Sequence, residues 1–207
     1  MSIVTLNDRG VRSVTTFGSL NTGSMVFIKK LTASSSSTLT FLNGSSSVVF
    51  DSTYKEYLFT FKNLHPSANA YTLFQGTTDG TNYNTTITST TFAAYHDEAD
   101  SFTALEYRAA GDLAQGTGFQ HLNEADNVGT DNDMNMSGFL RIFNPSSTTF
   151  VKHFMSNFNF SNGSNYSMNT YCAGYFNDTD DITAIQFKSS SGDIDSGTIK
   201  LYGIKDS

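Results

Sequence analysis

The sequence predicts an all-β fold, an antiparallel β-sandwich of jelly-roll type with an extended N-terminal arm. Aromatic residues make up 14% of the 207 residues, with 18 Phe and 10 Tyr, which is enough apolar mass for a packed core. Charged residues are only 15%, whereas serine, threonine and asparagine are abundant and compete with helix formation by bonding nearby backbone groups. Short β-forming runs alternate with turn residues, and no helical periodicity lies between them.

The length of the chain fits one domain with one core. Residues 1–24 mix small, polar and isolated apolar residues, and we expect them to form an extended arm or anchor that packs on a neighbour or along the domain. Residues 25–207 are expected to form the single β-sandwich domain. Its first two strands are predicted over 25–31 and 38–42, on either side of a serine run.

The next predicted strand, 54–61, shows the clearest alternation. Tyr57, Phe59 and Phe61 fall on one face of it, because successive side chains of a strand point to opposite faces. This face is therefore predicted to lie in the core.

Two further strands are predicted over 69–76 and 82–90. The connection between them contains Asp79 and Gly80, and Asp-Gly is a dipeptide that favours a tight hairpin turn. We therefore expect these two strands to pair with each other in one sheet.

The stretch 91–134 is predicted to be an irregular acidic insertion, with a short helix around 98–105. Long loops in compact domains tend to carry function or contacts, so a partner-contact or glycan-contact site is predicted here. Tyrosine rings stack on sugars and amides bond their hydroxyls, although tyrosine at strand edges and subunit contacts is the favoured interpretation. The candidate contact residues are Tyr95, His96, Asp97, Glu98, Tyr107, His121 and Asn123.

The regular pattern resumes after the insertion. In one segment Phe150, Phe154 and Phe158 recur at four-residue steps, and the preceding Asn-Pro turn and high β-propensity favour a strand. The remaining strands are predicted over 136–144, 149–158, 167–176, 182–189 and 198–204.

Charge excludes one class of partner. The formal net charge is −7, and the 12 Lys and Arg residues are scattered, with Lys29 and Lys30 as the tightest pair. Binding to a nucleic-acid backbone needs clustered basic residues, so no nucleic-acid partner is expected. No signal peptide is recognised and no run approaches the roughly 18 apolar residues of a membrane span, so no membrane insertion is expected.

The sequence contains no nucleophile elbow, no Cys–His catalytic pattern and no phosphate-binding loop. Cys172 is the single cysteine and lies in an apolar segment, where a small buried thiol is expected. We therefore predict that the protein is not an enzyme, with no catalytic residue, no cofactor-binding residue and no metal-binding residue.

A structural Ca²⁺ ion is kept as a hypothesis for the acidic turns. Asp131 and Asp133 resemble the start of a calcium loop, but the glycine and the final carboxylate of that loop are missing. Asp and Asn as turn formers are the favoured interpretation. The other acidic turns contain Asp178, Asp180, Asp181, Asp193 and Asp195.

Four segments resemble a family of small virion proteins of marine tailed phages, the cyanophages and pelagiphages. They are DSTYKEYLFTFKNLHPSANAY, QGTTDGTNYN, FLRIFNPSSTTFVKHF and AIQFKSSSGDIDSGTIKLYGIK, which lie between Asp51 and Lys205. The most specific element is the closing SGTIKLYGIK, because many phage jelly-roll modules end in a similar strand. The acidic part between Asp97 and Asp133 matches this family least.

The resemblance implies a non-enzymatic structural protein on the virion surface, as a capsid decoration, a fibre or a tail-associated protein. It implies a homo-oligomer, expected to be a trimer, in contact with other capsid or tail proteins. A tail adhesin that recognises host surface glycan is the alternative, and a polysaccharide hydrolase is a third hypothesis. The resemblance brings no catalytic residues with it.

Overall fold

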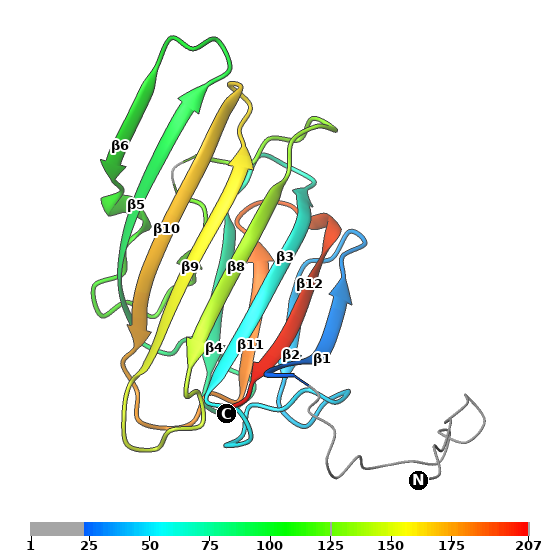
Figure 1. Cartoon of the computed structure of the whole chain (residues 1–207), viewed down its shortest axis with the longest axis vertical. Coiled ribbons are helices and arrows are strands. Elements are labelled where there is room, and N and C mark those ends of the chain that lie inside the picture. Colours follow the sequence, from blue (N-terminus) through cyan, green and yellow to red (C-terminus); the bar gives the residue numbers. More distant parts are fainter. Residues whose placement is uncertain (1–22, 125, 207) are drawn as a thin grey trace, which may run out of the picture.

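The computed structural model describes residues 23–124 and 126–206, and within them twelve strands form two antiparallel sheets that pack face to face (Figure 1). The large sheet has the order β1-β12-β3-β8-β9-β10-β5-β6, and the small sheet has the order β2-β11-β4-β7. The elements are β1 (Met25–Thr32), β2 (Leu39–Leu42), β3 (Glu56–Pro66), β4 (Thr72–Thr77), β5 (Ile87–Asp97), β6 (Thr103–Tyr107), the 3-10 turn η1 (Ala109–Gly111), β7 (Gln120–His121), β8 (Met136–Phe143), β9 (Lys152–Ser161), β10 (Tyr166–Phe176), β11 (Ala184–Ser189) and β12 (Ile194–Ile204).

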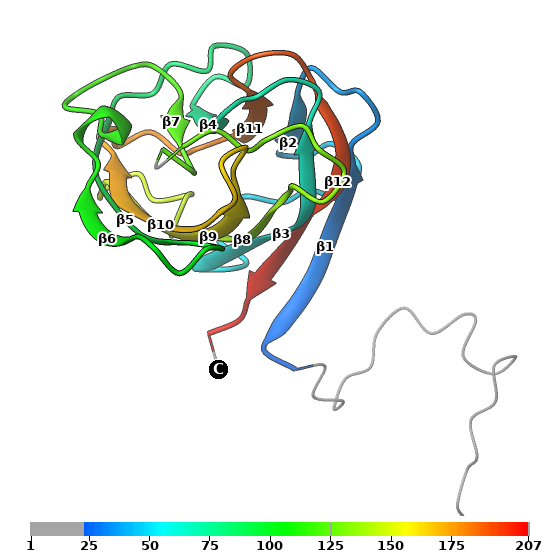
Figure 2. The ribbon, with the colours of Figure 1, turned by 90° about the horizontal axis from the view of Figure 1, so that it is seen from above.

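The predicted antiparallel β-sandwich is confirmed. The chain repeatedly passes from one sheet to the other, since β1, β3 and β12 belong to the large sheet whereas β2, β4 and β11 belong to the small one. Seen from above, the large sheet curves around the small sheet (Figure 2). The jelly-roll type stays a prediction, and the predicted arm lies outside the described residues except for residues 23 and 24.

Aromatic side chains fill the space between the sheets. Tyr57, Phe59 and Phe61 of β3 are all buried, so the predicted core face of this strand is confirmed. Phe187 of β11 meets Phe59 and Phe61 from the opposite sheet, edge to face, with ring centroids 5.3 Å and 5.1 Å apart. Such offset geometry is the arrangement that aromatic pairs prefer in a core.

The segment around Phe150 departs from its prediction in one respect. Phe154 and Phe158 lie buried in β9, but Phe150 precedes the strand and is 69% exposed. The hydroxyl of Ser147 accepts hydrogen bonds from the amides of Thr149 (3.2 Å) and Phe150 (3.0 Å), which extends the turn past the predicted start of the strand.

The predicted hairpin over 69–76 and 82–90 is wrong. β4 pairs with β11 and β7 in the small sheet, whereas β5 pairs with β10 and β6 in the large one. The Asp79 carboxylate accepts hydrogen bonds from the amides of Thr81 (2.8 Å) and Asn82 (2.7 Å) and from the hydroxyl of Thr77 (2.8 Å). These bonds hold a loop through which the chain crosses between the sheets, in place of a two-residue turn.

The predicted irregular insertion is also shorter than expected at its N-terminal end. Residues 91–97 belong to β5, and 103–107 form β6, so a hairpin stands where a short helix was predicted. Asp97 causes the turn, because its carboxylate accepts hydrogen bonds from the amides of Ser101 (2.8 Å) and Phe102 (2.9 Å). From residue 108 to 134 the described chain contains only η1 and β7 as regular elements.

Candidate functional site

The outer face of the large sheet, the side that points away from the small sheet, carries a row of four aromatic side chains interrupted by one asparagine. Phe139 of β8 lies opposite Asn157 of β9, which is followed by Tyr171 of β10, Phe92 of β5 and Tyr107 of β6. Residues opposite each other in an antiparallel sheet share a face, so the row is continuous across five strands. Its four aromatic members are between 37% and 63% exposed.

Two members of this row stack on each other. The rings of Phe92 and Tyr171 have centroids 5.0 Å apart and planes within 9° of parallel. Beside them, Asn157 donates from Nδ2 to Oδ1 of Asn169 at 2.7 Å, and Asn169 donates to the Tyr171 hydroxyl at 3.3 Å. The side chains are thus ordered by their neighbours before any partner binds. We call Phe92, Tyr171 and Tyr107 the aromatic ridge.

An apolar groove of about 480 Å³ lies on one side of the ridge. Its lining includes the small residues Ala173 and Gly174 and the larger residues Met155, His153 and Tyr175. The His153 and Tyr175 rings are 5.7 Å apart, and Met155 is 54% exposed. The groove exists because strand β10 places small side chains between larger ones from β9 and β10.

A second hollow of about 610 Å³ lies on the other side of the ridge, over β5 and β6. Its lining includes Ala94, His96 and Leu105. The outer face therefore has the aromatic ridge between two depressions, and apolar side chains of a partner could occupy both depressions.

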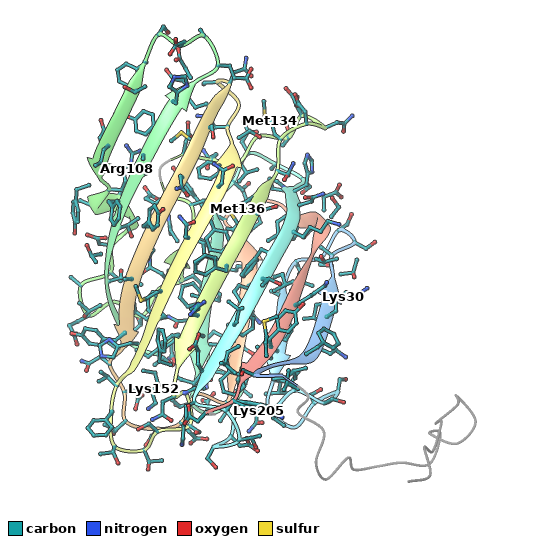
Figure 3. The ribbon with its side chains drawn as sticks, in the orientation of Figure 1. Lys30, Arg108, Met134, Met136, Lys152 and Lys205 are labelled. Atoms are coloured by element: carbon teal, nitrogen blue, oxygen red, sulfur yellow. The ribbon has the colours of Figure 1, made fainter. Side chains whose placement is uncertain are left out.

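Charged groups on the outer face gather on β1, β3 and β12, where Lys30, Lys62 and Lys200 lie, and are sparse around the ridge. Arg141 bonds Glu56 at 3.0 Å and lies over the Phe139 ring at 5.8 Å, so its charge is paired. Figure 3 places Lys30 at the β1 edge of the large sheet and Arg108 near the opposite edge, both away from the centre of the face. The part of the face formed by β8, β9, β10 and β5 combines aromatic residues and methionine with one paired arginine, a composition typical of protein interfaces.

A small polar pocket of about 170 Å³ lies on the opposite side of the same sheet, near the β5 and β10 ends. Tyr95 and Tyr166 contribute rings 5.9 Å apart, and Arg108, Asp126 and Asn162 contribute polar groups. Nδ2 of Asn162 donates to the Asp126 carboxylate at 2.7 Å. Aromatic rings beside amide, carboxylate and guanidinium groups have the chemistry to bind a sugar.

The structure scatters the predicted contact residues over several places. Tyr95 lines the polar pocket, whereas His96 lies on the outer face and bonds Asp100 at 3.0 Å. Asp97 is buried and holds the β5–β6 turn, and the hydrogen bond from the Ser101 hydroxyl lowers the pKa of its carboxyl. Glu98 lies exposed in this turn, where its amide donates to the carbonyl of Asn165 at 3.0 Å.

The remaining three predicted residues lie further along the chain. Tyr107 belongs to the aromatic ridge, while His121 stacks on Tyr71 with ring centroids 4.8 Å apart. Asn123 is fully buried: its Oδ1 accepts from the amide of Thr72 at 2.6 Å, and its Nδ2 donates to the carbonyl of Asp126 at 3.1 Å. Asn123 therefore holds a loop beside the polar pocket and does not face a partner.

The residues that sequence reasoning missed are those of the outer face. Phe92, Phe139, Met155 and Tyr171 come from four strands, and only the register brings them together. In β8 the apolar residues Phe139 and Leu140 are adjacent, so they point to opposite faces of the sheet. The sequence alone does not tell which of the two faces the core and which is exposed.

The aspartates of the acidic turns are the candidate ligands for a structural Ca²⁺ ion. Among residues 23–124 and 126–206, no three His, Cys, Asp or Glu side chains are placed to hold a metal ion. Asp178 accepts the amide of Asp180 at 2.9 Å, and the carbonyls of both residues accept hydrogen bonds from the buried Lys152 ammonium group. The Asp195 carboxylate accepts the hydroxyl of Ser35 at 3.0 Å. In the structure Asp178 and Asp195 therefore act as turn formers.

The Cys172 side chain is buried in the core. Burial raises the pKa of its thiol to about 12, so the thiol stays protonated at neutral pH. In the described part of the chain, no helix has the length and apolar character needed to cross a membrane.

No protein-family profile, no curated protein and no solved structure matches this chain.

Proposed function

We propose that this chain is a non-enzymatic structural protein of a tailed-phage virion, which binds neighbouring protein subunits through the outer face of its large sheet. The observation that supports the proposal is the exposed row from Phe139 to Tyr107, in which four aromatic residues and Asn157 lie side by side, with the apolar groove beside it. Apolar residues scattered singly over a surface need no explanation, but a contiguous patch marks an interaction site.

The chemistry of the face favours a protein partner over a small molecule. The groove is open and shallow, and the ridge rises beside it, so the surface offers relief over several strands and not one enclosed cavity. Its ordered rings lose little side-chain entropy on binding, which is a property of good interface anchors. The proposed neighbours are other copies of the chain, in a homotrimer, and other capsid or tail proteins.

The virion role is supported by the resemblance of the segments between Asp51 and Lys205 to phage virion proteins. A structural role also suits a β-sandwich whose aromatic core supports an exposed sheet face for contacts with other subunits. The protein is therefore proposed to be located in the virion, where its large sheet is covered and its loops face outward.

The proposal is tested by placing charges on the outer face. The double substitution Phe139→Asp and Met155→Glu changes two exposed side chains that point away from the core, so the fold is expected to persist. Leu42→Glu is the matched control, because Leu42 is an exposed apolar residue on the small sheet. Copies per particle are counted by quantitative mass spectrometry of particles from the encoding phage.

The double variant is expected to be absent from particles or strongly depleted, while the Leu42→Glu control enters at the normal copy number. Circular dichroism of the purified proteins checks that both are folded. Normal incorporation of a folded double variant would contradict the proposal, and so would absence of the unmodified chain from particles.

A second candidate function, a tail adhesin for host surface glycan, is favoured by the polar pocket around Tyr166. Tyr166→Ala removes one ring of this pocket. Tyr202→Ala is its control, because Tyr202 lies on β12, contacts Phe27 and does not line the pocket. An adhesin is expected to block infection when added free and to lose this effect on Tyr166→Ala alone. If the free chain does not inhibit infection, the adhesin is excluded; release of reducing sugar would instead indicate the hydrolase.

A further inference from the structure

The two edges of the large sheet differ in how they are protected. β1 and β6 are its edge strands among the described residues. β1 carries Lys29 and Lys30 and a register irregularity after Phe27, and lysines and bulges both prevent edge-to-edge pairing. β6, Thr103–Tyr107, contains neither lysine nor proline. Its pairing with β5 is regular and contains no bulge. The β6 edge is thus open to another strand.

The hydrogen-bond pattern shows which groups are free on β6. The amide of Arg108 donates to Thr91 at 2.9 Å, and the carbonyl of Phe102 accepts from Asp97 at 3.1 Å, so the even-numbered residues bond β5. Bonded and non-bonded residues alternate along an antiparallel strand. Thr103, Leu105 and Tyr107 therefore direct their amides and carbonyls away from β5, and no described residue pairs with them. All three residues are exposed, and Leu105 is 72% exposed.

We propose that β6 pairs antiparallel with β6 of a second copy of this chain, about a two-fold axis at Leu105. In this register Leu105 faces Leu105 of the second copy, and Thr103 faces its Tyr107. All three residues with free backbone groups then bond the second copy, without disturbing the bonds between β5 and β6. The two large sheets become one continuous sheet.

The charge of Glu106 disfavours one shifted register. Glu106 is the one charged residue of the strand, and pairing about Leu105 sets it opposite Ala104 of the second copy. A shift of two residues in one direction would set Glu106 opposite Glu106, and like charges directly opposite each other are destabilising. The side chains also favour pairing. The exposed Leu105 side chain becomes shielded from water by Leu105 of the second copy, and Tyr107 continues the aromatic ridge across the axis.

The pairing is separate from the proposed homotrimer contact, which uses the outer face, and it is independent of the virion role, since it needs only a second copy of the folded chain. It leaves Phe139 and Met155 outside the contact, because these residues lie on β8 and β9. The variant Phe139→Asp with Met155→Glu should therefore still form this pair. Failure of the proposed function and failure of this pairing are thus distinguished by different variants.

The direct test is a cross-link at the axis. A Leu105→Cys variant places two thiols on residues whose Cα atoms lie about 5.5 Å apart in a hydrogen-bonded antiparallel pair. This separation is within the range of disulfide bonds. Thr103→Cys is the control. In the proposed register residue 103 faces Tyr107 of the second copy, which is four strand positions from that copy's residue 103, so the two thiols belong to residues roughly 14 Å apart. Cys172 is buried and does not compete.

Mild oxidation is expected to convert Leu105→Cys largely to a covalent dimer on a non-reducing gel, and to leave Thr103→Cys largely uncross-linked. No dimer with Leu105→Cys, or equal dimer with both variants, overturns the proposed register.

A second pair of variants separates backbone pairing from side-chain contact. Leu105→Pro removes an amide that points away from β5, so it spares the ladder within the chain, whereas Leu105→Ala keeps this amide. By sedimentation equilibrium, Leu105→Pro is expected to weaken the dimer at least about tenfold more than Leu105→Ala. A monomeric unmodified chain across the concentration range, or a folded Leu105→Pro variant that dimerises as strongly as Leu105→Ala, overturns the pairing.

Discussion

The ring of Phe92 lies almost parallel to the ring of Tyr171, with 5.0 Å between centroids, and both rings remain exposed on the outer face. They are direct cross-strand neighbours on β5 and β10. A stacked aromatic pair contributes to stability beyond the area that it buries. The pair therefore orders the outer face while leaving it accessible to a partner.

A double-mutant cycle of Phe92→Ala and Tyr171→Ala measures this contact. We expect a coupling free energy of about 0.5–1.5 kcal/mol, since this is the usual strength of an aromatic pair beyond burial. Urea unfolding of the four proteins provides the measurement. Additive effects of the two substitutions would show that the rings stack without stabilising each other.

Gln75 connects β4 to the long segment before β7. Its buried side chain donates to the carbonyls of Thr85 (3.1 Å) and Gly118 (2.7 Å) and accepts from the amide of Gly76 (2.8 Å). Gln75→Met keeps the volume but leaves these groups without a partner, which costs about 1–3 kcal/mol for a buried polar group. Hydrogen exchange is expected to accelerate in residues 113–120, and unchanged protection there would contradict this role.

Gly174 allows β10 to approach β5 and β9 closely. A Cβ at this position would lie 2.5 Å from the carbonyl oxygen of Thr88 and 2.7 Å from the Phe154 ring. Gly174→Ala is expected to lower the free energy of unfolding by about 1–3 kcal/mol, as overpacking of a core does. Gly118→Ala is the control, because nothing lies within 4 Å of its Cβ position. Equal stabilities of the two variants in urea would refute the packing argument.

Cys172 gives the protein a specific dependence on pH. Burial raises the pKa of this thiol from 9.0 to about 12, so the unfolded state loses the proton first as the pH rises. Its contribution is fully present below pH 9 and is lost between pH 9 and 12. By pH 10 the loss is on the order of 1.4 kcal/mol.

Cys172→Ala removes this contribution while leaving the other titrating groups in place. The free energy of unfolding of the unmodified protein should thus fall more steeply between pH 8 and pH 10 than that of the variant. Urea unfolding at several pH values measures both curves. Parallel curves would show that the thiol is not buried in solution.

Some elements could be predicted from the sequence because one face of each strand is buried. Tyr57, Phe59 and Phe61 alternate with more exposed residues, and this period is visible without a structure. Pairing between strands is a different matter. The side chain of Asp79 holds a crossing loop through hydrogen bonds that an Asp-Gly dipeptide also allows in a hairpin, so local sequence could not distinguish the two.

The candidate site was harder to predict for the same reason. Tyr107 was singled out for its residue type, but its neighbours Phe92 and Tyr171 lie on strands that only the sheet register brings together. Asp97 looked like part of an acidic loop, whereas its carboxylate is used within the turn that it forms. Residue type indicated which side chains could contact a partner, whereas the pairing of distant strands determined where on the sheet these side chains lie.

The most direct test of the proposed function is a cryo-electron microscopy map of the virion that encodes this chain. We expect the outer face of the large sheet to be covered by a neighbouring subunit, with Phe139, Met155 and Tyr171 shielded from solvent. A map in which the chain is present but these three side chains face bulk solvent would contradict the proposal.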